Sequence, residues 1–190
     1  LTLNELPADL TNIGNNAFLY CRNLALTALP ASLTSIGSNA FEGCDKLALT
    51  ELPAGLTSIN LSVFKYCAGL ALTELPPGVT SIGTSAFEGC TSLALTELPD
   101  NLTLIGITSF KNCTSLALTE LPSGLTDISF NAFNGCTGLT RLRLGNALKS
   151  IATNAFTDCT NLTQITCDFA QGAVSGAPWG ATNANITYLR

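Results

Sequence analysis

The chain of 190 residues contains no histidine and no methionine, and only 11% of its residues are charged. Histidine is the commonest general base and the commonest metal ligand, so its absence removes the simplest catalytic and metal-binding sites. The 8 basic residues are scattered and the formal net charge is −5. Because nucleic acids and anionic membranes bind clustered Lys and Arg, neither is expected as a partner. No apolar run approaches the roughly 18 residues that would span a membrane.

The motifs of the common enzyme classes are missing as well. There is no Gly-x-Ser-x-Gly nucleophile elbow and no Gly-rich phosphate-binding loop ending in Lys-Ser or Lys-Thr. Without histidine, a Ser or Cys nucleophile lacks its usual activating base. We therefore predict that the chain is not an enzyme and has no catalytic residues, no metal site and no cofactor.

One pattern recurs every 23 residues. Seven cysteines hold the same place in it, namely Cys21, Cys44, Cys67, Cys90, Cys113, Cys136 and Cys159. A phenylalanine precedes each cysteine by three residues, an isoleucine precedes it by eight, and a leucine follows it by three. A unit of this length is too short to bury its own apolar side, whereas stacked copies cover one another. The sequence therefore predicts a solenoid, with a period in the leucine-rich repeat range of about 20–29 residues.

Local patterns predict three short elements in each copy. Residues 47–52, Leu-Ala-Leu-Thr-Glu-Leu, favour a short strand that ends at Pro53. The Leu-Thr-x-Ile pattern that follows alternates and favours a second short strand. Segments such as residues 38–44 begin with Ser-Asn and have helical spacing between Phe and Cys, which favours one or two helical turns. The predicted fold class is accordingly α/β.

The run Leu-Thr-x-Ile-Gly-x-x-Ala-Phe-x-x-Cys-x-x-Leu, nearly complete in residues 33–47 and 79–93, resembles the BspA-like leucine-rich repeat of bacterial surface proteins and some parasitic protists. The resemblance covers residues 1–162 in seven copies. It implies a curved solenoid with a parallel sheet on the concave side and the short helical turns on the other side. It also implies a secreted or cell-surface bacterial protein that acts in adhesion to host proteins or other cells.

One leucine column departs from that family pattern. The family strand has apolar residues three and five places after its leading Leu, as only residues 139–144 do among the seven copies. The other copies have a Leu two places on, namely Leu3, Leu26, Leu49, Leu72, Leu95 and Leu118. A regular strand would point these leucines away from the core. Because burying each leucine is worth roughly 1.5–3 kcal/mol, we expect a bend or bulge of the backbone that turns these leucines inward. If they are not turned inward, they form an exposed apolar stripe that marks a binding surface.

The two ends of the repeat array differ. We expect one solenoid domain of seven repeats over residues 1–162, followed by a final strand and a cap over residues 163–190. Within the cap, Trp179 is expected to cover the last copy, and a ligand-stacking role is the alternative. The chain begins at Leu1 inside an expected strand with no polar capping repeat before it, so either upstream residues have been removed or that end meets a partner.

The cysteine column predicts buried free thiols. A spacing of 23 residues matches no metal site. Neighbouring copies about 5 Å apart would permit a disulfide by distance, but parallel Cβ directions disfavour one. Small buried thiols are ordinary core residues.

An acidic column is the strongest candidate site. Five glutamates share one position, namely Glu5, Glu51, Glu74, Glu97 and Glu120, and Ala28 and Arg143 interrupt them. On a concave sheet these side chains would point outward about 5 Å apart. One interpretation is a docking strip made of Glu51, Glu74, Glu97 and Glu120 for a basic protein patch, a cation or a sugar. The other is a duplicated, solvated glutamate that keeps the sheet soluble.

Two functions fit these observations. The first is a non-catalytic module that binds an extracellular protein or glycan, as the resemblance implies. The alternative is a structural spacer within a larger surface protein. Neither needs nucleic acid or a membrane span.

Overall fold

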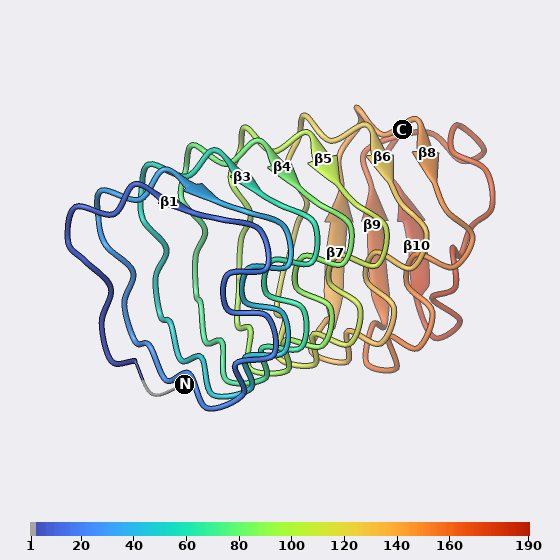
Figure 1. Cartoon of the computed structure of the whole chain (residues 1–190). Coiled ribbons are helices and arrows are strands. Elements are labelled where there is room, and N and C mark those ends of the chain that lie inside the picture. Colours follow the sequence, from blue (N-terminus) through green and yellow to red (C-terminus); the bar gives the residue numbers. More distant parts are fainter. Residues whose placement is uncertain (1–2) are drawn as a thin grey trace.

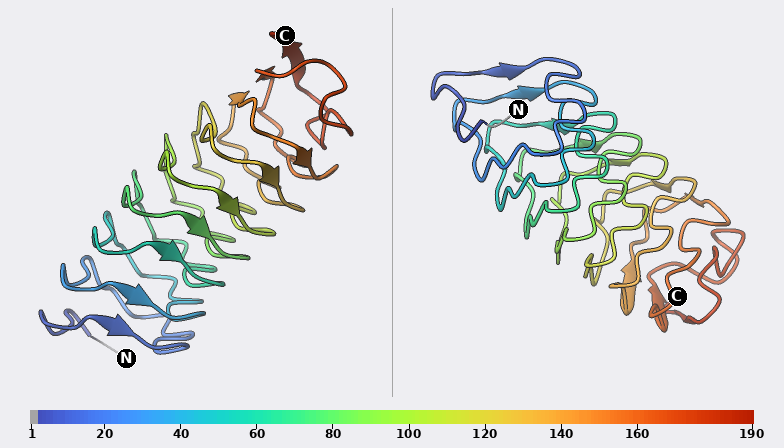
Figure 2. Two further views of the ribbon diagram at one scale, coloured as in Figure 1. Left: turned by 90° about the horizontal axis from the view of Figure 1, so that it is seen from above. Right: turned by 60° about the horizontal axis from the view of Figure 1, so that its bottom comes forward.

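The chain winds into a stack of coils, with one 23-residue copy in each coil, here called a rung (Figure 1). The computed structural model describes residues 3–190. Successive rungs lie side by side in every view (Figure 2). From residue 12 to residue 167, residues that pair between strands are one repeat apart, as in Ile59 with Ile82 and Ile82 with Ile105. The predicted solenoid is therefore confirmed.

A strip of two-residue parallel strands runs along one side of the stack. The strip contains β1 (Asn12–Ile13), β2 (Ser35–Ile36), β3 (Ser58–Ile59), β4 (Ser81–Ile82), β5 (Leu104–Ile105), β6 (Asp127–Ile128) and β8 (Ser150–Ile151). In each strand the isoleucine is buried and the preceding residue is at least partly exposed. The Leu-Thr-x-Ile pattern thus forms the second short strand that its alternation predicts.

A second parallel sheet is regular only near the C-terminus. Its strands are β7 (Arg141–Leu144), β9 (Gln164–Cys167) and β10 (Asn185–Tyr188), in the order β7-β9-β10. In β7, Leu142 and Leu144 are buried and the two arginines are exposed. This alternation is what a regular strand requires, and residues 139–144 are the copy whose sequence provides it.

The equivalent segments of earlier rungs bend instead of forming a strand. Leu49 is fully buried, and Leu52 is only 9% exposed. The chain bends at Thr50, between these two leucines. A regular strand cannot bury both, because residues three apart face opposite sides. The rungs are still joined, since Ala48 N–H donates to the Leu26 carbonyl at 3.1 Å. The expectation that the backbone bends to turn the shifted leucines inward is therefore confirmed for Leu26, Leu49, Leu72, Leu95 and Leu118, all at most 1% exposed.

The predicted helical turns are wrong. Segments such as residues 38–44 form a series of turns, and no helix occurs in the part of the chain that the structure describes. Amides along the segment alternate between two partners. Asn39, Phe41 and Gly43 donate to carbonyls of the next rung at 2.7–2.9 Å. The amides between them donate within the turn, for example Glu42 to the Asn39 carbonyl at 3.2 Å. A helix would keep all of these N–H groups within one rung, so stacking excludes it.

The side of the stack formed by these turn segments is here called the turn side. The phenylalanine column forms the centre of the core on the turn side. Adjacent rings from Phe18 to Phe156 are stacked with centroids 5.2–5.7 Å apart and interplanar angles of 6–12°. All of these rings are fully buried except Phe18 in the first rung, which is half-buried. Each ring is covered by its neighbours in the stack, as the repeat pattern predicts.

Trp179 follows Phe156 at the C-terminal end. Its side chain is fully buried, and its indole N–H donates to the Ser175 carbonyl at 2.7 Å. The Trp179 carbonyl accepts the N–H of Phe156 at 3.0 Å, which continues the pattern by which one rung's amides bond to the next. The ring also packs edge-on against Phe169 at 6.4 Å. A ring in this position has no free face for a ligand.

Candidate binding groove

The acidic column borders a groove on the side of the stack that carries the bent leucine segments. The groove has a volume of about 910 Å³, and its lining includes Glu51, Glu74, Glu97 and Glu120. All four glutamates are exposed. Prolines such as Pro53 and Pro76 follow the glutamates by two residues and also line the groove. The structure thus brings together the four glutamates that the sequence singled out.

The local bend explains why each glutamate faces solvent. In the rung of Glu51, both Leu49 and Leu52 are buried, so the bend at Thr50 leaves the threonine and the glutamate on the outer surface. The prolines then stop any regular ladder. Four rungs with the same local sequence therefore present four carboxylates in one row.

Among the described residues, the row has no ion-pair partner of opposite charge. The described residues form four ion pairs, and none of them includes Glu51, Glu74, Glu97 or Glu120. Carboxylates on rungs about 5 Å apart repel each other by roughly 1 kcal/mol in water and about 3 kcal/mol near a protein surface. The row therefore attracts cations into the groove.

An ion pair closes the C-terminal end of the groove. Arg143, which takes the glutamate position in the seventh copy, donates from Nε to both carboxylate oxygens of Asp168 at 3.0 Å. Both residues line the groove. Sequence reasoning identified Arg143 as an interruption but missed Asp168. Asp168 occupies the repeat position that is proline in the first six copies, and that substitution was the available signal.

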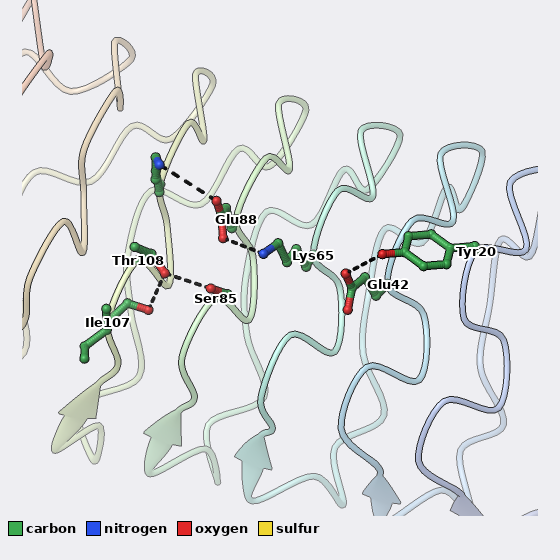
Figure 3. A network of polar contacts seen from close by, with 8 residues as sticks. Tyr20, Glu42, Lys65, Ser85, Glu88, Ile107 and Thr108 are labelled. Atoms are coloured by element: carbon green, nitrogen blue, oxygen red, sulfur yellow. Dashed lines mark hydrogen bonds and ion pairs between the residues drawn. The ribbon is translucent and has the colours of Figure 1, made fainter.

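A second charged column lies on the turn side, and its residues alternate in charge instead of all being acidic. Glu42, Lys65, Glu88 and Lys111 alternate in sign along one repeat position, here called the charge ladder. Lys65 Nζ lies 3.1 Å from Glu88 (Figure 3). Lys111 Nζ lies 4.0 Å from the same carboxylate. Glu88 is only 8% exposed, and these pairs compensate for its burial. Within the described residues, Lys65, Glu88 and Lys111 are thus neutralised by one another, whereas the four groove glutamates form no ion pair.

The cysteine column is structural. All eight cysteines are free, and all except the half-buried Cys21 are buried. From Cys44 to Cys159, each Sγ donates to the carbonyl of the phenylalanine one rung earlier at 3.0–3.1 Å. Burial raises the pKa of Cys44 to about 12 and that of Cys159 to about 12. Thiols held in this way are poor nucleophiles, because the thiolate is the reactive form.

Stacked 23-residue coils, with a leucine, an isoleucine and a phenylalanine from each coil in one continuous core, define a leucine-rich repeat protein. The defining pattern of the BspA type leucine rich repeat region matches residues 1–117 and 80–171, in 6 copies. The chain therefore belongs to the BspA-type leucine-rich repeat family.

Solved bacterial structures share the fold. A leucine-rich repeat protein from Bacteroides ovatus is 29% identical with a TM-score of 0.74, and the alignment covers 92% of this chain and 50% of that one. The T. pallidum leucine-rich repeat protein is 32% identical with a TM-score of 0.68, over 85% of this chain and 77% of that one. The pneumococcal vaccine antigen PcpA, 20% identical with a TM-score of 0.51, covers 98% of this chain and 67% of its own and shows the fold alone. No curated protein matches the chain.

This chain spans about half the length of the B. ovatus protein. Within the described residues, no helix has the length and apolar character needed to cross a bilayer.

Proposed function

We propose that the chain is a non-catalytic binding module that holds a positively charged segment of an extracellular protein in the groove lined by Glu51, Glu74, Glu97 and Glu120. The observation that carries the proposal is the row itself: four exposed carboxylates on consecutive rungs, bordering one groove, with no ion-pair partner in the described residues. The biological role that fits is adhesion to host proteins or to other cells.

Electrostatics favours a cationic partner over a neutral one. A Lys or Arg side chain placed between two neighbouring rungs would contact two carboxylates and relieve their mutual repulsion. The same field would steer a basic segment toward the groove and raise its rate of association. Because these side chains are exposed, added salt should weaken the binding.

A location outside the cell is part of the proposal. The family includes bacterial surface proteins, and the cysteine chemistry is compatible with an oxidising environment. Buried thiols whose pKa is raised by burial, as for Cys44 and Cys159, resist oxidation even where disulfides normally form.

Charge removal without a change of shape tests the groove. The variant carries the four substitutions E51Q, E74Q, E97Q and E120Q, and the matched control is Glu5→Gln, at the same repeat position but outside the groove lining. Purified matrix proteins and mucins that the intact chain captures would be titrated by biolayer interferometry at low and high salt. We expect the quadruple variant to bind at least about tenfold more weakly at low salt and to lose most of the salt dependence.

Unchanged affinity of the quadruple variant for every captured protein would reject the groove as the site. That result would favour the alternative function, a structural spacer, because a spacer needs no charged groove.

A further inference from the structure

Two tyrosines on the turn side are exposed at a backbone position that disfavours them. Tyr20 and Tyr66 occupy the same repeat position, are 55% and 46% exposed, and have φ angles of 55° and 60°. The other rungs fill this left-handed position with Gly43, Gly89, Gly135, Asn112 or Asp158. Glycine, asparagine and aspartate adopt positive φ at little cost, whereas a bulky aromatic residue does not.

Folding alone does not account for these tyrosines. A half-exposed ring gains only part of the burial free energy of a fully buried aromatic side chain. Glycine or asparagine would adopt the positive φ at these two sites at a lower free-energy cost. Exposed residues in sparsely populated backbone conformations cluster at functional sites. Among the described residues, Tyr20 and Tyr66 are the two that combine a positive φ with a large, exposed, largely apolar side chain.

Each tyrosine lies across the glycine of the next rung. A side chain on Gly43 would collide with the Tyr20 ring, and one on Gly89 would collide with the Tyr66 ring. The Tyr20 hydroxyl donates to Glu42 at 3.1 Å, which directs the ring along the stack (Figure 3). Lys65 Nζ lies 5.0 Å from the centroid of the Tyr66 ring. The sequence order Tyr, Gly, Tyr, Gly thus places an aromatic ring across a glycine twice, two rungs apart.

The charge ladder lies beside both platforms. Glu42, Lys65 and Glu88 occupy the position directly before the Tyr–Gly column in consecutive rungs. Rungs on this side are spaced like their phenylalanine rings, 5.2 and 5.7 Å apart over the first two steps. The surface therefore offers two aromatic rings two rungs apart, with the Glu42 carboxylate on the rung between them and the Lys65 ammonium group beside the second ring.

We propose that Tyr20 and Tyr66 are stacking platforms for an extended β-1,4-linked glycan that runs along the solenoid axis. A β-linked pyranose has an apolar face of C–H groups, which packs on the electron-rich face of an aromatic ring. In an extended β-1,4-linked chain each sugar advances by about the spacing of one rung, and alternate sugars present the same face. Two platforms two rungs apart therefore contact alternate sugars, while the half-buried Glu42 accepts from the hydroxyl groups and Lys65 donates to them.

This site is independent of the acidic groove. The tyrosines belong to the turn segments, and none of the residues that line the groove lies on the turn side. Binding of a neutral glycan by stacking also needs no net charge, so it should depend only weakly on salt.

Substitution by asparagine tests the proposal without disturbing the fold. Asn112 already occupies the equivalent position with a φ of 60°, so Tyr20→Asn and Tyr66→Asn fit the backbone. The control Ile107→Thr removes another exposed apolar side chain of the turn side and places there the residue that Thr84 supplies one rung earlier. Cellohexaose and chitohexaose are the probes, and maltohexaose, whose α-linked chain is coiled, is the control sugar. Isothermal titration calorimetry reports the affinity.

We expect cellohexaose, chitohexaose or both to bind, with each single variant weaker and the double variant weakened on the order of tenfold. Ile107→Thr and the quadruple Glu→Gln groove variant should bind the sugar like the unmodified chain. The proposal is overturned if neither probe binds at millimolar concentration, if maltohexaose binds equally well, or if the double variant keeps full affinity. The thermal unfolding temperature of the double variant should be no lower than that of the unmodified chain, so a loss of binding cannot be ascribed to misfolding.

Discussion

Ser109 should destabilise the fold, and its replacement by alanine should stabilise it. The Ser109 side chain is fully buried, and among the described residues no hydrogen-bond partner is available to its Oγ. The same repeat position is alanine in most rungs, including the fully buried Ala86 and Ala132 on either side. Leaving a buried hydroxyl unsatisfied costs about 1–3 kcal/mol. Removing one oxygen leaves only a small void, so Ser109→Ala should stabilise the chain by about 1 kcal/mol.

The reverse substitution one rung away is the matched control. Ala86→Ser places a hydroxyl in the same environment and should destabilise the fold by a similar amount. Urea unfolding followed by far-UV circular dichroism gives both values, and the midpoints should move in opposite directions with an unchanged m-value. A Ser109→Ala variant less stable than the unmodified chain, or a neutral Ala86→Ser, would refute the expected gain, because the hydroxyl would then have a partner in solution.

Three further perturbations follow from the stack. Phe87→Ala removes a ring packed between two others and should lower the unfolding free energy by about 3–5 kcal/mol. Phe18→Ala, at a half-buried end ring, should lower it by less than half of that amount. Equal losses of unfolding free energy in urea would contradict the stacked core. Burial raises the pKa of Cys44 from 9.0 to about 12. The contribution of the buried Cys44 thiol to the unfolding free energy is therefore complete below pH 9 and is lost as pH rises toward 12. An unfolding free energy that stays constant across this pH range would count against buried thiols. Removing the row charges with E51Q, E74Q, E97Q and E120Q should raise the unfolding free energy at low salt by about 1 kcal/mol for each relieved pair, and the gain should vanish at high salt.

The repeat columns allowed most of the fold to be predicted from the sequence. A 23-residue period in Cys44, Phe41 and Ile36 leaves only stacking as a way to bury them, because no single copy can do so. The inward turn of Leu49 was predictable for the same reason, since the energy of burying a leucine exceeds the cost of a bend. The position of the row of four glutamates also followed from the period alone.

Features that depend on the neighbouring rung were not predictable from local patterns. The spacing between Phe41 and Cys44 is the same in a helix and in the observed turns, and only the N–H partners in the next rung decide between them. The pairing of Lys65 with Glu88 was missed although the alternation of charge at 23-residue intervals was visible. The division at residue 162 between repeats and cap stays a prediction, as does a role for the glutamate row in binding.

The direction of the hydrogen bonds between rungs has a consequence for the ends of the stack. On the turn side, N–H groups such as that of Phe41 point toward the C-terminal end, whereas on the bent-leucine side the N–H of Ala48 points toward the N-terminal end. Peptide dipoles on the two sides therefore oppose each other, unlike those of an α-helix, which add along its axis. A solenoid of this kind can gain or lose rungs without building up partial charge at its termini.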